Sequence, residues 1–208
     1  MDNGNIQVII LTVMSVRILG ESYGINIEGI NLSRKEISKL PESIGKFIKL
    51  QYLYLENNQL TELPESIGEL VNLKRLHLRN NQLTSIPESI GKLVNLIQLD
   101  LENNRLTTLP ESIGNLINLQ YLDLNSNQLK KLPSSILNIK KLLIINTSTY
   151  EINNLSMDTE FLIFAWLGEE LTNLPTGLKE IWIGRENKKL KHKLPFGCVI
   201  KYYDKFEY

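Results

Sequence analysis

The chain has 208 residues, 42% of them hydrophobic, and its 23 basic residues balance its 23 acidic residues. A formal net charge of zero argues against a protein that binds nucleic acid or a membrane surface through excess positive charge. The longest apolar run, residues 6–14, is too short to span a bilayer and lacks the flanks of a secretory signal. The single cysteine, Cys198, cannot form disulfide-bonded end caps, so we expect an intracellular protein.

Residues 1–26 precede a pattern with a 23-residue period that occupies residues 27–155. We expect this first segment to be an N-terminal cap, in which the apolar residues 6–14 form a strand or hairpin over the open end of the core. The first copy of the pattern follows, with Lys35 at a position where later copies carry asparagine. Its apolar and proline positions are Ile27, Ile30, Leu32, Ile37, Leu40 and Pro41.

The period is marked most clearly by five prolines, each 23 positions after the one before: Pro41, Pro64, Pro87, Pro110 and Pro133. They lie in near-copies of one phrase, which reads LPESIG in its commonest form and LPSSI in the last copy. A unit of about 20–30 residues cannot bury an apolar face alone and has to stack on its neighbours. The period therefore predicts a solenoid.

Each copy combines a strand pattern with a helical pattern. The LxxLxL stretch, as in Leu96, Leu99 and Leu101, contains a period-2 alternation, which indicates a short strand with one buried face. In the stretch that begins with PESIG, as in PESIGKLVNL, apolar residues three apart, such as Ile113 and Leu116, indicate a helical or 3₁₀ turn. A proline can start this turn without losing a needed donor. We expect an α/β solenoid with a parallel sheet on the concave side and these bulkier turns on the convex side.

Two series of asparagines recur with the period. Because an amide both donates and accepts, an asparagine inside the turn after each strand can bond backbone groups of its own coil and the adjacent one. We expect this buried ladder at Asn58, Asn81, Asn104 and Asn127. A second series precedes each strand, where asparagine tolerates the left-handed conformation that ends a helix, so a C-cap role is expected for Asn72, Asn95 and Asn118.

The pattern degrades near residue 155. In the last copy the strand positions fall on Leu142, Ile145 and Thr147, and Ser156 replaces proline. Residues 156–208 are expected to form shorter, irregular repeats and a C-terminal cap, because Pro175 and Pro195 are only 20 positions apart; a separate small cap is the alternative. The strand positions here would be held by Phe161, Phe164 and Trp166 and then by Leu178, Ile181 and Ile183.

The pattern LxxLxLxxNxLxxLPxxIxxLxxL closely resembles the intracellular leucine-rich-repeat family in its 23-residue form. It looks like the repeats of Ras-associated scaffolds, polarity scaffolds and related plant proteins over about residues 27–155. The asparagine- and isoleucine-rich composition is similar to that of leucine-rich-repeat proteins of giant amoeba viruses, and residues 156–208 resemble the shorter bacterial-effector type of repeat. The resemblance implies a right-handed superhelix shaped as a horseshoe arc and a concave sheet that binds proteins.

The residues that alternate with the buried leucines are expected to line the concave side. Tyrosine and arginine are enriched in binding hot spots, and here a basic rung lies beside an acidic one. The candidate partner-binding residues are Tyr52, Tyr54, Arg75, His77, Arg79, Gln98, Asp100, Glu102, Tyr121 and Asp123, and we expect Ile144, Ile163 and Trp182 to extend the patch. Alternatively, these charges mainly pair with one another and keep the face soluble.

No group of residues predicts an active site, a metal site or a cofactor site. His77 and His192 lack further histidine or cysteine ligands at short spacing, and Cys198 has no nearby histidine. The recurrent IGK lacks the first glycine and the final Ser/Thr of a phosphate-binding loop. We therefore expect no catalytic residue, no metal and no cofactor.

The sequence thus predicts a non-enzymatic, cytoplasmic module that binds an unidentified protein or peptide on its concave face, and neither nucleic acid nor a membrane. An adaptor that presents proteins to ubiquitin ligase machinery is the alternative, although residues 1–26 contain no recognisable ligase-docking segment. A thiol enzyme that uses Cys198 is the third hypothesis. Self-association through the C-terminal strand stays open.

Overall fold

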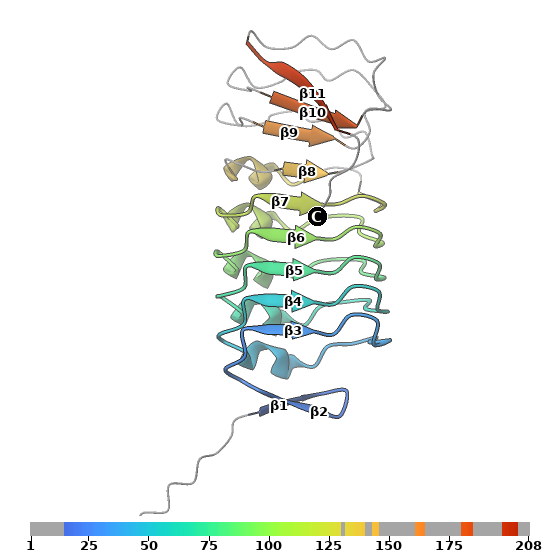
Figure 1. The fold of residues 1–208 in the computed structure, drawn as a ribbon, viewed down its shortest axis with the longest axis vertical. Coiled ribbons are helices and arrows are strands. Elements are labelled where there is room, and N and C mark those ends of the chain that lie inside the picture. Colours follow the sequence, from blue (N-terminus) through green and yellow to red (C-terminus); the bar gives the residue numbers. More distant parts are fainter. Residues whose placement is uncertain are drawn as a thin grey trace, which may run out of the picture.

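The computed structural model describes residues 15–129, 132–139, 143–145, 161–164, 180–184 and 197–203. From residue 29 to residue 139, each coil of the chain contributes a short strand and a 3₁₀ helix, and the coils stack along one axis (Figure 1). The expectations for residues 6–14, Ser156, Trp166 and Leu178 lie outside the described residues. Within those ranges, no helix has the length and hydropathy needed to cross a membrane.

A six-stranded parallel sheet forms one side of the stack. The residue at the centre of each strand pairs with its counterpart one coil away, so that Leu53, Leu76 and Leu99 are in register and fully buried. The concave face is the face of this sheet that points away from the buried leucines. The strands are β3 (Gly29–Asn31), β4 (Tyr52–Tyr54), β5 (Arg75–His77), β6 (Gln98–Asp100), β7 (Tyr121–Asp123) and β8 (Leu143–Ile145).

The helical pattern of the sequence forms 3₁₀ helices, which lie behind the sheet in Figure 1. Each begins after a proline in extended conformation, whose carbonyl accepts a bond from the isoleucine three residues on, as from Ile67 N to Pro64 O at 3.0 Å. Proline is suitable here because the missing N–H would have had no helical partner. The helices are η1 (Glu42–Lys46), η2 (Glu65–Glu69), η3 (Glu88–Lys92), η4 (Glu111–Asn115) and η5 (Ser134–Asn138).

The glycine of the repeated phrase allows neighbouring 3₁₀ helices to approach closely. A Cβ on Gly68 would lie 2.5 Å from the carbonyl oxygen of Ser89, and one on Gly91 would lie 2.7 Å from that of Ser112. Both distances are shorter than any real Cβ contact, so a larger residue would push the coils apart. The stacking distance on the convex side is therefore set by glycine.

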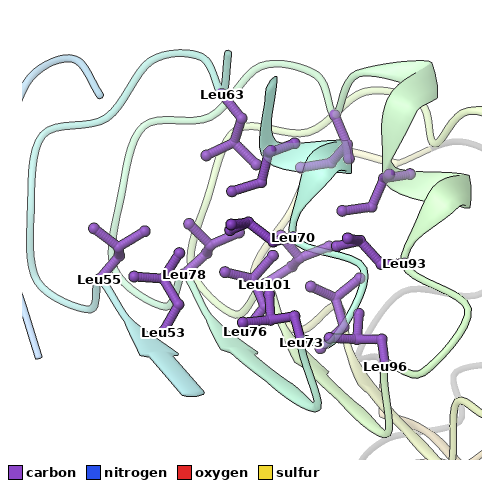
Figure 2. Close-up of a cluster of buried hydrophobic side chains, with 14 of the residues drawn as sticks. Leu53, Leu55, Leu63, Leu70, Leu73, Leu76, Leu78, Leu93, Leu96 and Leu101 are labelled. Carbon is purple, nitrogen blue, oxygen red and sulfur yellow. The ribbon is translucent and has the colours of Figure 1, made fainter. Parts of the chain in front are cut away.

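The core is a column of leucine and isoleucine side chains between the sheet and the 3₁₀ helices. Figure 2 shows that leucines from successive coils, including Leu53, Leu76 and Leu101, point into one shared interior. Leu76 and Leu101 are 0% exposed, as are most other members. Because each coil completes the packing of the next, a single core extends from Val16 in the first hairpin to Ile139.

The asparagine of each turn is bonded on all sides. In Asn81, Oδ1 accepts a bond from Leu60 N at 3.0 Å, and Nδ2 donates to Leu78 O of its own coil and to Leu55 O of the preceding coil. Asn58 and Asn104 are bonded in the same way and are buried, whereas Asn127 makes the same contacts at the half-buried end of the series. These side chains join consecutive coils where the sheet ladder has ended.

The C-cap expectation for the second asparagine series is wrong. None of Asn72, Asn95 and Asn118 has a positive φ; instead each donates from Nδ2 to a backbone carbonyl 24 residues earlier. The left-handed conformation occurs elsewhere, at residues just before the turn asparagine: Asn57, Asn80, Asn103 and Ser126. The second series is therefore used to bond one coil to another through the side-chain amide, and not to end a helix in the left-handed backbone conformation.

An antiparallel hairpin adjoins the first coil. It pairs β1 (Ser15–Ile18) with β2 (Glu21–Gly24), and the buried side chains of Val16 and Ile18 belong to the core. The hairpin falls within the segment expected to be the N-terminal cap, although its residues follow the apolar run 6–14.

At the other end, β9 (Phe161–Phe164), β10 (Glu180–Gly184) and β11 (Val199–Tyr203) form a three-stranded parallel sheet above β8 (Figure 1). Phe161 pairs with Glu180 and Glu180 with Val199, so these coils are 19 residues long.

The expected register is wrong at this end. Ile144, not Ile145, pairs with Leu122, so Ile144 occupies the register row of the buried leucines and does not extend the concave patch as expected. Likewise, Ile181 pairs with Leu162 rather than Phe164. The cause is the coil that precedes β8, which is one residue shorter than the 23-residue period. The coils of 19 residues then shift the register further.

Candidate functional site

The ten candidate residues lie on β4–β7 and on the chain just after β5 and β6. Cα pairing across the strands puts them in columns: Tyr52, Arg75, Gln98 and Tyr121 in the first, and Tyr54, His77, Asp100 and Asp123 in the second. Arg79 and Glu102 follow two residues later in their coils. The parallel ladder thus brings all ten onto one continuous part of the concave face. Ile163 and Trp182 pair with each other on β9 and β10.

The end of this face over β4 and β5 is aromatic and basic. The Arg75 guanidinium lies 6.0 Å from the centroid of the Tyr52 ring, within reach of a cation–π contact. The Tyr54 and His77 rings meet edge to face, with centroids 5.0 Å apart. His77 Nδ1 lies 3.3 Å from Glu56 Oε1, so one carboxylate of the preceding coil holds the imidazole in place.

The end over β6 and β7 is acidic. Asp123 is only 3% exposed; its Oδ1 accepts a bond from Asn125 N at 2.9 Å and its Oδ2 accepts one from Tyr121 Oη at 3.1 Å. Asp100 Oδ1 accepts from Glu102 N at 3.0 Å, and Glu102 Oε2 pairs with Arg79 Nε at 3.1 Å. The half-buried and buried carboxylates are therefore fixed by short local bonds.

Burial raises the pKa of all three acids. Loss of solvation is the main cause for Asp123, whose pKa rises to about 7, and repulsion from Asp100 and Glu102 adds to it against the bond from Asn125. The pKa of Asp100 is also raised by burial, although the bond from Glu102 N opposes the rise. Burial raises the pKa of Glu102 as well, with Arg79 acting in the opposite direction.

A hollow of about 400 Å³ lies between the two ends. It is lined by nine residues: Glu56, Arg75, His77, Arg79, Gln98, Asp100, Glu102, Tyr121 and Asp123. The Nε2 atom of His77 is shielded from solvent and has no hydrogen-bond partner in the described part of the chain. The hollow thus combines unlike charges, which are suited to binding a polar group.

The acidic end is also the place where a cation could be held. Asp100, Glu102 and Asp123 each offer an oxygen, and these atoms lie within 4.8 Å of one another. Hard cations such as Mg²⁺ and Ca²⁺ bind carboxylate oxygens, but Arg79 already neutralises Glu102.

The candidate residues omitted Glu56, which lines the hollow and contacts both His77 and Ser33. Its position one period before Arg79 places it in the same column as Arg79 and Glu102.

The sequence analysis also missed a row of exposed aliphatic residues with the same period, Ile48, Val71, Val94 and Ile117. Near this row, a second hollow of about 550 Å³ is lined mainly by Asn, Gln and Lys side chains.

Of the residues considered for catalysis, the structure describes Cys198 and His77, which lie in the coils of β11 and β5. Cys198 is half-buried just before β11, and His192 lies outside the described residues. His77 is committed to Glu56 and Tyr54 on the concave face.

Comparison with known proteins identifies the repeats. A family model described as a leucine-rich repeat region matches residues 29–104 and 87–159, which together are more than half of the chain. Among curated proteins, none matches the chain.

Two solved structures are similar to different degrees. YopM from Yersinia enterocolitica WA-314 is 28% identical with a TM-score of 0.61; the match covers 86% of this chain and 38% of YopM. The leucine-rich-repeat protein LIC12759 of Leptospira interrogans is 23% identical with a TM-score of 0.34, over 82% of this chain and 60% of that one. The chain therefore spans well under half the length of YopM.

Proposed function

Since the chain belongs to the leucine-rich repeat family, we propose that it is a protein-interaction module whose concave face binds a protein or peptide. Proteins of this family generally act as interaction scaffolds rather than enzymes. The observation that supports the concave face is its hollow, which gathers one tyrosine, two arginines and incompletely paired carboxylates on and just after the adjacent strands β5, β6 and β7. Such residues are enriched in binding hot spots.

The alternative in which the charges only satisfy one another fits part of the face. Arg79 pairs with Glu102, and His77 with Glu56. Arg75 has no carboxylate within ion-pair distance among the described residues, and three acids share one guanidinium at the acidic end. This remaining charge supports a binding surface. No observation favours the ubiquitin ligase adaptor.

The finer assignments are part of the same proposal. The constant spacing of the prolines supports the 23-residue LPxxI type, and the single cysteine supports a cytoplasmic location. The similarity of composition to giant amoeba-virus proteins would place the chain in a host cytoplasm.

The proposal is tested by comparing the proteins captured from a lysate of the native cell by matched variants. Arg75→Glu and Asp100→Lys reverse charge on the concave face, while Lys46→Glu and Glu65→Lys reverse exposed charges on the convex 3₁₀ helices. We expect one captured protein to be lost from both concave variants and retained by both convex ones, with thermal stability nearly unchanged. Capture that depends on Lys46 or Glu65 instead would place the interaction on the convex side.

A further inference from the structure

The charges of the concave face are sorted by strand. The basic residues Arg75, His77 and Arg79 belong to the coil of β5, whereas Asp100, Glu102 and Asp123 belong to the next two coils. The remaining acid of the hollow, Glu56 in the coil of β4, is paired with His77. This sorting defines the chemistry of a partner, provided that the concave face is the binding surface as proposed above. An interface aligns opposite charges and thereby fixes the register of its partner.

At the basic end, Arg75 is the group available to a partner. Its side chain is exposed, and its recorded contact is the Tyr52 ring, 6.0 Å from the guanidinium. Arg79, in contrast, is held 3.1 Å from Glu102. A guanidinium stacked on an aromatic ring keeps its donors free for a bidentate bond to a carboxylate. An acidic residue of a partner would complete this pair.

At the acidic end, negative charge exceeds positive charge. Asp100, Glu102 and Asp123 lie within 4.8 Å of one another, and Arg79 is the cation paired with them among the described residues. The hollow beside them is about 400 Å³, which is large enough for the head of a lysine or arginine side chain.

The two ends are separated by a distance that an extended segment can span. Neighbouring strands lie about 4.8 Å apart and alternate residues of one strand about 6.6 Å apart. Arg75 is in the first column on β5 and Asp123 in the second column on β7, so their Cα atoms are roughly 12 Å apart by these spacings. About three to four extended residues cover this distance.

We propose that the concave face binds an extended segment of a partner protein with an acidic residue against Arg75 and a basic residue, about three to four positions away, in the hollow beside Asp100 and Asp123. The partner is thus a protein segment with opposite charges in close succession, not a uniformly acidic or uniformly basic one.

Binding of this segment is linked to protonation. Burial raises the pKa of Asp123 to about 7, and the charged or titratable groups around it are Asp100 and Glu102 of the neighbouring coil and Tyr121 of its own strand. Its partner on β8 is the uncharged Ile145. Because a cation stabilises the ionised carboxylate, binding releases a proton, and affinity increases as the pH rises towards about 7 and is constant above it.

The test is selection from displayed random peptides of about twelve residues, which are long enough to cross the four strands. Wild-type protein, Arg75→Glu and Asp100→Asn are used as targets, with Lys46→Glu as the convex control. We expect wild type and Lys46→Glu to enrich peptides with an acid and a base three to four positions apart. Arg75→Glu should bind these peptides at least about tenfold more weakly, and Asp100→Asn should lose the preference for the basic residue.

Each other outcome overturns the inference in a distinguishable way. Enriched peptides that lack paired charges but compete with the lysate partner for the concave face would refute the charge pattern and retain the proposed function. Peptides that bind all four proteins equally would argue against the concave face itself. Failure to enrich any peptide would refute a linear segment. Self-association that Arg75→Glu abolishes, measured by sizing chromatography, would assign the face to a second copy of this chain.

Discussion

Replacement of Asn104 by alanine tests how the coils are joined. The side chain is 6% exposed, and its Oδ1 is the recorded acceptor for the buried Leu83 N at 3.0 Å. Its Nδ2 donates to Leu78 O and Leu101 O, each at 3.0 Å. These carbonyls also accept from Asn81 and Asn127, so the loss leaves one donor, Leu83 N, without its partner.

An unpaired buried donor costs about 1–3 kcal/mol, and the weakened bonds to the two carbonyls add roughly 1 kcal/mol. We therefore expect Asn104→Ala to reduce the free energy of unfolding by about 2–4 kcal/mol, or to lower Tm by roughly 6–12 °C for a reduction near 3 kcal/mol. Urea denaturation and a thermal scan measure this. Asn115→Ala, at an exposed position on η4, is the control and should change stability by less than about 0.5 kcal/mol. Equal effects of the two substitutions would refute the ladder as a source of stability.

Three further predictions concern packing and pH. Gly91→Ala should lower the free energy of unfolding, measured in urea, by about 1–3 kcal/mol because its Cβ would lie 2.7 Å from Ser112. Gly24→Ala, whose Cβ would have no atom within 4 Å, is the control and should be nearly neutral. Equal effects would exclude close approach of the coils as the reason for glycine at position 91. Leu99→Ala should cost about 2–5 kcal/mol by urea denaturation because the side chain is 0% exposed, and a cost below about 1 kcal/mol would contradict a shared core. For Asp123, burial raises the folded-state pKa from 3.8 to about 7, so the stability it contributes is complete below about pH 4 and is lost as pH rises through 7. Denaturation between about pH 5 and pH 8 should show this decline, at most about 3 kcal/mol over this range, in wild type and not in Asp123→Asn. A decline that persists in the variant has another cause.

The coil class and the stacking direction could be predicted because five copies carry the same residue types at the same positions. An isolated leucine does not indicate which way it points, but Leu53, Leu76 and Leu99 at one spacing must share an environment. The recurrence of a polar residue at the position of Asn81 likewise indicated a common internal contact. The 3₁₀ helices could be expected from the proline and the isoleucine three residues later.

The register near β8 could not be predicted because residues 142–145 are all apolar. Period-2 alternation specifies a buried face only where apolar and polar residues alternate, and four apolar residues in succession fit either register. The same holds for β9, whose four residues are Phe, Leu, Ile and Phe. A coil shortened by one residue therefore leaves no trace in the sequence pattern.

The side-chain contacts on the concave face could not be predicted from the sequence either. The period places Arg75 and Arg79 on the same coil, but only side-chain geometry shows that Arg79 reaches Glu102 while Arg75 lies over Tyr52. Asn72 was misassigned because an asparagine can either adopt the left-handed backbone of a helix C-cap or use its amide to bond another coil. The carbonyl of Ile48 in the neighbouring coil determines that the amide bond forms. Residues facing solvent are not constrained by packing, so the repeat does not specify them.

The most direct test of the concave face is site-specific photo-cross-linking. A photoreactive amino acid replaces Gln98, which lines the hollow, or Lys46 on the convex side, and the protein is irradiated in a lysate of its native cell. Our account predicts that the Gln98 position cross-links to the protein whose capture requires Arg75, and that the Lys46 position does not. Cross-links to that protein from Lys46 and not from Gln98 would contradict it.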